Sequence, residues 1–261
     1  VLDQPGAPYD LVKTCYHYSI NLLGRYEGPV VSRIVRVVDC CLPERDESTR
    51  GELLRCQDRI RERSTVLVLN NPENRDRWRA LYGCEPRIEL VPTGCPREIP
   101  DPGASPYGQS ERVMLFLGSV AAPRMVRLMN EAAQRLRGFV RVHLVGLNKA
   151  HLYGGGGLEL DPAIVDHGEA CEQDTWRFVR HASIGLALAT GPHPFDNDVS
   201  KILNYLRGGL PVLSEEPIVN NALVRETGFG KIFDYDDAEN LAAKARELLS
   251  APLTDRRDQV M

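Results

Sequence analysis

The chain has 261 residues, of which 43% are hydrophobic and 26% are charged, and its formal net charge is −4. These values are typical of a globular protein with room for two domains. The negative balance argues against non-specific nucleic-acid binding, no apolar run approaches the roughly 20 residues that span a bilayer, and the first residues lack a signal-peptide pattern. The seven cysteines form no CxxC pair and no zinc-type spacing. We therefore expect a cytoplasmic protein with no metal and no nucleic-acid partner.

Short apolar runs alternate with amphipathic stretches along the chain, which indicates β/α units around parallel sheets. In the N-terminal region a charged, helix-like segment covers about residues 44–63, and Asn71-Pro72 predicts the start of a second helix, as an N-cap followed by proline. The strands expected here are 9–14, 29–35, 65–69 and 87–92.

A change in composition then indicates a domain boundary. Between Pro96 and Ser110 the sequence contains four prolines and two glycines and almost no apolar periodicity. We expect a linker over 98–110, which separates an N-terminal domain (1–97) from a C-terminal domain (111–261).

The C-terminal region shows the alternation more strongly. Its expected helices cover about 119–137, 171–181 and 199–207, and a last helix runs to 249 after a capping box made by Asp236 and Glu239. The strands expected between them are 113–117, 140–146, 164–168, 184–188 and 210–214. This pattern predicts a doubly wound, Rossmann-like α/β domain.

Ligands of open parallel sheets bind at the carboxyl ends of the strands, so the residues after strands are the first candidates. Gly118-Ser119 forms a turn after the strand 113–117, where backbone N–H groups could face an anion. Arg124 could hold a phosphate with its two-pronged guanidinium. The alternative is an ordinary strand-to-helix turn with a solvated arginine.

A second candidate is the loop that leads into the helix 199–207. Ser200 and Lys201 lie in the first turn of that helix, where the helix dipole disfavours a cation unless an anion is nearby. Asn204 follows one turn later on the same face and could bind a ribose hydroxyl. The alternative is a solvated helix start without a ligand.

Weaker candidates lie after three other strands. His167-Gly168 could hold the edge of a nucleobase through backbone groups. In the N-terminal domain His17 and Asp39 follow two predicted strands, and either could deprotonate an acceptor hydroxyl. For His17 a packing role is the alternative.

The order of these motifs resembles the GT-B superfamily of glycosyltransferases over residues 60–250. The segments that carry the resemblance are Ile88–Gly94, Leu115–Ser119, Val165–Gly168 and Ser200–Val212. The resemblance implies two Rossmann-like domains with parallel sheets. The N-terminal domain, with only about 95 residues before the linker, looks truncated beside those of the superfamily.

The resemblance also implies an activity, the transfer of a sugar from a UDP- or GDP-type donor to an acceptor hydroxyl without metal or further cofactor. Ser200 and Lys201 would contact the diphosphate, Asn204 the ribose, and Arg124 the phosphates from the opposite wall. The acceptor would be a saccharide or a lipid-linked molecule, as in polysaccharide biosynthesis. Peripheral association with the inner face of the cell membrane is therefore a further expectation.

The sequence departs from the family-4 pattern of two glutamates separated by seven residues, because these positions are Asp196 and Asn204. An amide at the second position resembles the xanthan glucuronosyltransferase group, so hexosyl or uronosyl transfer and a retaining or inverting outcome stay open. Two alternatives also stay open. The chain could be a non-catalytic nucleotide-sugar-binding protein or fragment, or a sugar-nucleotide 2-epimerase of the same fold.

Overall fold

A computed structural model describes residues 9–39, 47–120, 122–149, 159–194 and 197–250. The chain divides into two compact units, residues 1–93 and 94–261. This division falls between Thr93 and Gly94, a few residues before the predicted linker.

The first unit is a four-stranded parallel sheet in the order β1-β2-β3-β4. Its strands are β1 (Val12–Cys15), β2 (Val30–Arg33), β3 (Val66–Leu69) and β4 (Arg87–Leu90). The helices are the 3-10 helix η1 (His17–Leu23), α1 (Glu47–Arg63) and α2 (Pro72–Tyr82). The cap predicted at Asn71 is confirmed, because its side-chain oxygen accepts from the backbone N–H of Asn74 at 2.8 Å.

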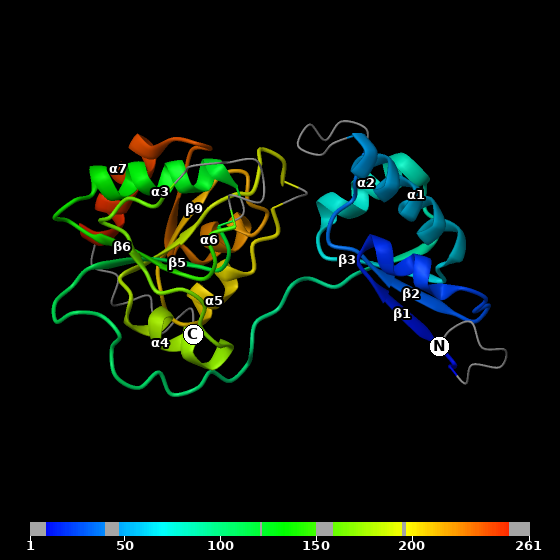
Figure 1. Cartoon of the computed structure of the whole chain (residues 1–261), viewed down its shortest axis with the longest axis horizontal. Coiled ribbons are helices and arrows are strands. Elements are labelled where there is room, and N and C mark those ends of the chain that lie inside the picture. The colour runs from blue at the N-terminus through cyan, green and yellow to red at the C-terminus, as the bar shows by residue number, and fades with distance from the viewer. Residues whose placement is uncertain (1–8, 40–46, 121, 150–158, 195–196, 251–261) are drawn as a thin grey trace. The chain divides into compact units, whose positions relative to one another are not determined.

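All three helices of the first unit pack on one face of its sheet (Figure 1). Strands added one after another in one direction, joined by right-handed crossovers, place every connection on the same side. Leu67 and Leu69 of β3 are fully buried under these helices, whereas Val66 and Val68 on the other face are half-exposed. The first unit therefore has two layers.

The second unit is a six-stranded parallel sheet in the order β10-β9-β8-β5-β6-β7. Its strands are β5 (Val113–Leu117), β6 (Arg141–Val145), β7 (Val165–Asp166), β8 (Ile184–Ala187), β9 (Val212–Glu215) and β10 (Gly230–Phe233). The helices are α3 (Pro123–Arg135), α4 (Glu172–His181), α5 (Lys201–Arg207), α6 (Asn221–Thr227) and α7 (Ala238–Ser250).

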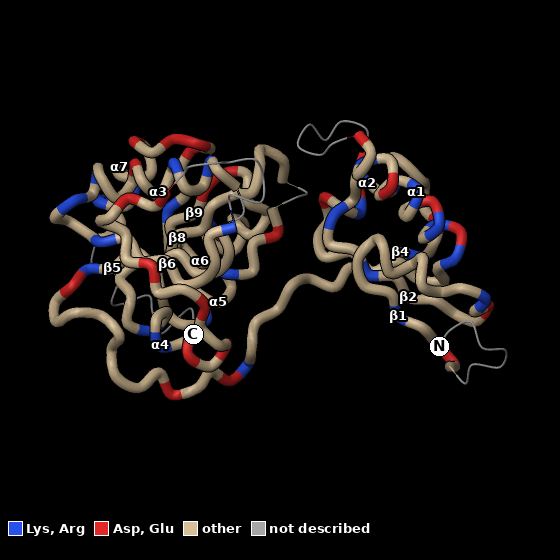
Figure 2. The backbone as a smooth tube through the Cα atoms, in the orientation of Figure 1, with Lys and Arg blue, Asp and Glu red and all other residues tan. Residues whose placement is uncertain are grey.

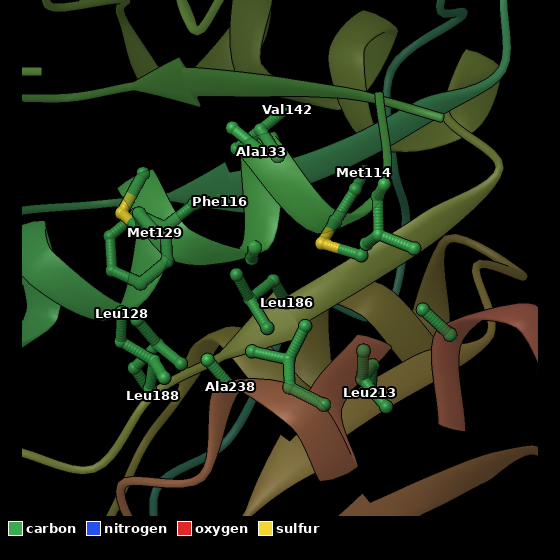
Figure 3. Packing of buried hydrophobic residues seen from close by; sticks show 14 of the residues in the cluster. Met114, Phe116, Leu128, Met129, Ala133, Val142, Leu186, Leu188, Leu213 and Ala238 are labelled. Atoms are coloured by element: carbon green, nitrogen blue, oxygen red, sulfur yellow. The ribbon is translucent and has the colours of Figure 1, made fainter. Parts of the chain in front are cut away.

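The chain builds this sheet outward from β5 in one direction and then returns to build it from β8 in the other. The reversal places α3 and α7 on one face and α4, α5 and α6 on the other, which gives three layers (Figure 1). On the α3–α7 face Phe116 packs with Met129, and Leu186 and Leu213 lie nearby (Figure 3). This is the doubly wound order that the sequence predicts.

The structure of the C-terminal region differs from the sequence analysis in three places. The segment predicted as a linker lies along the second unit, where the Tyr107 hydroxyl donates to the Phe178 carbonyl at 2.8 Å. Residues 221–233 form α6 and β10, which the sequence reading did not include. The cap of α7 is Asp237, whose carboxylate accepts from the N–H of Asn240 at 2.8 Å, whereas Asp236 is ion-paired with Arg127 instead.

Basic and acidic residues are interspersed along both units instead of forming one stripe of a single charge (Figure 2). No helix in the described part of the chain is long and apolar enough to cross a membrane.

Candidate functional site

The sheet of the second unit reverses its strand order between β5 and β8, and this point defines the crevice in which such sheets bind ligands. Tyr205 of α5 is inserted here. Its hydroxyl accepts from the N–H of Leu117 at 2.8 Å and lies 3.1 Å and 3.2 Å from the carbonyls of Leu115 and Leu186. A methyl group at Gly185 would overlap the tyrosine ring, so a glycine is required beneath it. Tyr205 therefore ties β5 to β8 just below the crevice.

Three glycines line the carboxyl ends of β5, β6 and β7. Gly118, Gly146 and Gly168 all adopt positive φ, at 108°, 143° and 67°. Gly118 donates to the carbonyl of Val145 and Gly146 donates to that of Gly168, both at 2.8 Å. A methyl group at Gly146 would lie 2.2 Å from the carbonyl oxygen of Gly118. This edge is thus a strip of close-packed backbone, in which Gly118 and Gly168 carry no side chain of their own.

Lys201 extends from the start of α5 onto this glycine strip. Its amine lies 3.7 Å from the centroid of the Phe116 ring, and a methyl group at Gly118 would lie within 4 Å of it. Among the described residues no carboxylate and no hydrogen-bond acceptor pairs with this amine. Burial lowers the pKa of Lys201 to about 7. A lysine placed against backbone and an aromatic face, without a counter-ion, is suited to receive an anion.

Arg124 lies near the crevice but is already engaged. It forms a two-pronged pair with Glu215 at 2.6 Å and 3.1 Å, and it also donates to the carbonyl of Ala189. Glu215 is fully buried and also accepts the N–H groups of Ala189 and Asp236. The phosphate contact predicted for Arg124 would therefore require it to give up part of this network.

The residue predicted to face a nucleobase, His167, belongs to a chain of polar side chains. Its Nε2 lies 2.9 Å from Nδ1 of His143, and Nε2 of His143 lies 3.4 Å from a carboxylate oxygen of Glu111. The rings of Tyr107 and Phe178 surround the two imidazoles with edge-on contacts. Burial lowers the pKa of both histidines.

The two residues predicted for acid–base chemistry lie in the first unit and have partners there. His17 is buried, and its Nε2 lies 3.2 Å from the amide oxygen of Gln57, which also accepts from the N–H of Val38. Asp39 is ion-paired with Arg77. Gln57 thus links the ends of β1 and β2, and the packing role considered for His17 is present in the structure.

The remaining predicted residues lie around the crevice or outside the described part. Ser119 and Ser200 are exposed, and Asn204 is half-buried with a side chain that makes no hydrogen bond to another described residue. Asp196 lies outside the described residues.

Sequence reasoning missed several residues that build this edge or hydrogen-bond to the side chains at it. Gly146 carried a signal, a glycine directly after an apolar strand, of the kind that drew attention to Gly118. Glu215, Glu111 and His143 carried none, because their partners are distant in the sequence. In the described ranges no cluster of three or more His, Cys, Asp or Glu side chains could hold a metal ion.

A surface hollow of about 390 Å³ lies elsewhere on the second unit. Arg112, Arg137 and Arg141 are among its lining residues, at the amino ends of β5 and β6. Because this is the edge opposite to the switch-point crevice, the hollow is not the candidate site.

No protein-family model matches the chain, and no curated protein matches it. Several solved structures do match the chain. WaaG, a glycosyltransferase involved in lipopolysaccharide biosynthesis, is 16% identical with a TM-score of 0.71, over 97% of this chain and 73% of WaaG. HepE of Anabaena, solved with UDP and glucose, is 15% identical with a TM-score of 0.71, over 97% and 71%. Sucrose-phosphate synthase of Thermosynechococcus elongatus is 16% identical with a TM-score of 0.68, over 97% and 69%. With two parallel-sheet units superposing on these enzymes, the chain has the GT-B glycosyltransferase fold.

Proposed function

We propose that the chain binds a nucleoside diphosphate sugar of the UDP or GDP type and takes part in transfer of its sugar to an acceptor hydroxyl. The observation that carries the proposal is Lys201, a lysine without a counter-ion among the described residues, on the glycine strip beside the switch point. Its ammonium would neutralise the diphosphate as the glycosidic bond breaks, which is electrostatic stabilisation of the leaving group without a metal.

Other residues of the same edge support the proposal. Asn204 lies on α5 one turn after Lys201, and its side chain makes no hydrogen bond to another described residue, which suits a ribose hydroxyl. Ser200 is exposed beside it. A structure of HepE holds UDP-glucose, and one of a TarM mutant holds UDP together with saccharides, which favours a UDP-type donor and a saccharide acceptor. Hexosyl or uronosyl transfer stays open, as does a lipid-linked acceptor.

The catalytic roles of His17 and Asp39 remain predictions. If His17 deprotonates the acceptor, His17→Gln abolishes turnover and leaves nucleotide binding intact. If Asp39 is the base, Asp39→Asn has this effect. A protein that only binds nucleotide sugars would show no sugar transfer before or after these changes.

The test of the donor site is calorimetric titration of UDP, GDP and ADP into the chain and into Lys201→Met, which keeps the apolar contact with Phe116. Lys244→Met on α7 is the matched control, since Lys244 is a surface lysine paired with Glu247. We expect one nucleotide to bind, Lys201→Met to weaken it at least about tenfold (~1.4 kcal/mol), and Lys244→Met to leave it unchanged. The proposal is contradicted if Lys201→Met leaves nucleotide binding unchanged, or if none of UDP, GDP and ADP binds.

A further inference from the structure

The hydrogen bonds that link Glu111, His143 and His167 determine which ring nitrogens of the two histidines carry a proton. An ionised carboxylate only accepts, so His143 donates to Glu111 through Nε2–H. Burial alone would raise the pKa of Glu111, but the N–H of Gly108, His143 and Arg141 together hold it below its ordinary value. The carboxylate is therefore ionised at neutral pH.

The histidine tautomers follow from this starting point. His143 is almost completely buried, with 3% of its surface exposed, and burial lowers its pKa, so it is neutral and carries a single N–H. With that N–H on Nε2, its Nδ1 is an acceptor and receives the Nε2–H of His167. His167 is neutral for the same reason. Its remaining nitrogen, Nδ1, then carries a lone pair and makes no hydrogen bond to a described residue.

The position of His167 in the sheet would let this lone pair accept a hydrogen bond from a bound nucleotide. His167 follows β7, two strands from β5, where Lys201 lies over Phe116. Two strand spacings amount to roughly 10 Å, a span that a nucleoside diphosphate covers between its phosphates and its base. The glycine strip formed by Gly118, Gly146 and Gly168 runs along this path, with the amine of Lys201 at its Gly118 end.

We infer that Glu111 and His143 are positioning residues that present Nδ1 of His167 as an acceptor to the base of the bound nucleotide, and thereby select uracil over cytosine. Uracil carries an N–H at N3, whereas N3 of cytosine is itself an acceptor. The inference rests on the proposed donor site and assigns the base-reading atom within it.

One added proton reverses this selection. Whichever ring carries the charge, a singly protonated pair has hydrogens on Nε2 of His143, between the rings, and on Nδ1 of His167, which becomes a donor. A second proton would put N–H groups on both facing nitrogens at 2.9 Å, so it cannot enter while the bond persists. The charged and titratable groups that face the pair are Glu111, Arg141, Tyr107, Asp166 and Arg177.

The proton assignment is tested by long-range ¹H–¹⁵N NMR of the histidine rings in the full chain at pH 8. We expect Nε2 to be protonated and Nδ1 to be unprotonated in both His143 and His167. Glu111→Leu removes the acceptor and should release the tautomers, whereas Glu111→Gln keeps an acceptor oxygen and should preserve them. A His167 that carries its proton on Nδ1 at pH 8 overturns the inference.

Base selection is tested by the ratio of UDP to CDP affinity at pH 8 and pH 5. The ratio cancels the effect of Lys201, which acts on the diphosphate of both. We expect UDP to be favoured about tenfold or more at pH 8, the preference to shrink or reverse as the pair takes up a proton at acidic pH, and N3-methyl-UDP to bind like CDP. His143→Phe keeps a ring against Tyr107 but no longer fixes the tautomer of His167, so it should reduce the preference for UDP at pH 8.

The outcomes separate the inference from the proposed function. The donor site stands and the inference fails if UDP binding depends on Lys201 but the ratio of UDP to CDP affinity changes neither with pH nor in His143→Phe. If neither nucleotide binds at any pH, the donor site fails, and the base assignment fails with it.

Discussion

The two units are built from the same β/α repeat, yet only the second has a switch point. In the first unit the strands lie in chain order, one face of the sheet is covered, and buried and half-exposed residues alternate along β2 and β3. In the second unit the order reverses between β5 and β8, both faces are covered, and β8 and β9 are buried at every position. The reversal creates both the third layer and the crevice, and this is why the proposed nucleotide site lies in the second unit.

The first prediction is that the crevice edge depends on one buried ion pair. Glu215→Ala removes the two-pronged partner of the guanidinium of Arg124 and leaves it only a longer ion pair of 3.4 Å with Asp236, which should cost about 3 kcal/mol of stability. The neighbouring Glu216 pairs with Arg225 at the surface, so Glu216→Ala should cost no more than about 1 kcal/mol. Because the units need not unfold together, the measurement is hydrogen exchange resolved by peptide. Equal effects of the two substitutions would contradict the account.

The second prediction concerns the hydroxyl group of Tyr205 at the switch point. Tyr205→Phe leaves the N–H of Leu117 without its acceptor at the switch point, which should cost about 1–3 kcal/mol. Tyr26→Phe in the first unit is the matched change, where the hydroxyl makes only longer contacts of 3.2 Å and 3.3 Å to backbone carbonyls. Denaturant melts followed separately in each unit should show the larger loss for Tyr205→Phe. A larger loss for Tyr26→Phe would mean that the switch point does not depend on this hydroxyl.

The third prediction compares the same substitution, valine to alanine, in the two-layered first unit and the three-layered second unit. Val212 of β9 is fully buried, whereas Val68 of β3 lies on the half-exposed face. Val212→Ala should destabilise its unit by about 1.5 kcal/mol or more, from two buried methyl groups, and Val68→Ala by clearly less. Thermal unfolding monitored unit by unit measures both. If the two losses are equal, the open face of the first sheet is covered in solution.

The last prediction concerns the pH dependence of stability. The pKa of Lys201 is depressed to about 7 in the folded chain, against about 10.4 when unfolded, so the unfolded chain binds more protons between these values. The contribution of Lys201 to stability therefore rises as the pH rises from about 7 to about 10. The stability of the native chain minus that of Lys201→Met should increase over this range, and the same difference for Lys244→Met should stay flat. A flat difference for Lys201 would show that its amine is solvated.

Much of the fold could be predicted from the sequence, because strands of a doubly wound sheet are short apolar runs and helix starts carry caps such as Asn71. The order of the motifs from Leu115 to Val212 also indicated the superfamily. Element ends were less accurate, and α6 and β10 were missed because a seven-residue helix and a four-residue edge strand carry little periodic signal.

The site was predictable only where a single residue carries the signal. Lys201 was selected as a candidate because a cation at a helix start conflicts with the helix dipole, and its role stays a prediction. The partners of Arg124 and His167 were not predicted, because Glu215 lies 91 residues from Arg124 and His143 lies 24 residues from His167. No local pattern encodes such pairs, since they form only when the sheet brings its strand ends together.

The central claim, that a nucleoside diphosphate binds against Lys201, is tested most directly by counting protons. Calorimetric titration of UDP at pH 8, in two buffers of different ionisation enthalpy, measures proton uptake on binding. With a pKa of about 7 the free amine is mostly neutral at this pH, and a bound diphosphate must raise that pKa. We predict uptake close to one proton by the native chain and none by Lys201→Met. UDP binding without proton uptake would contradict the account.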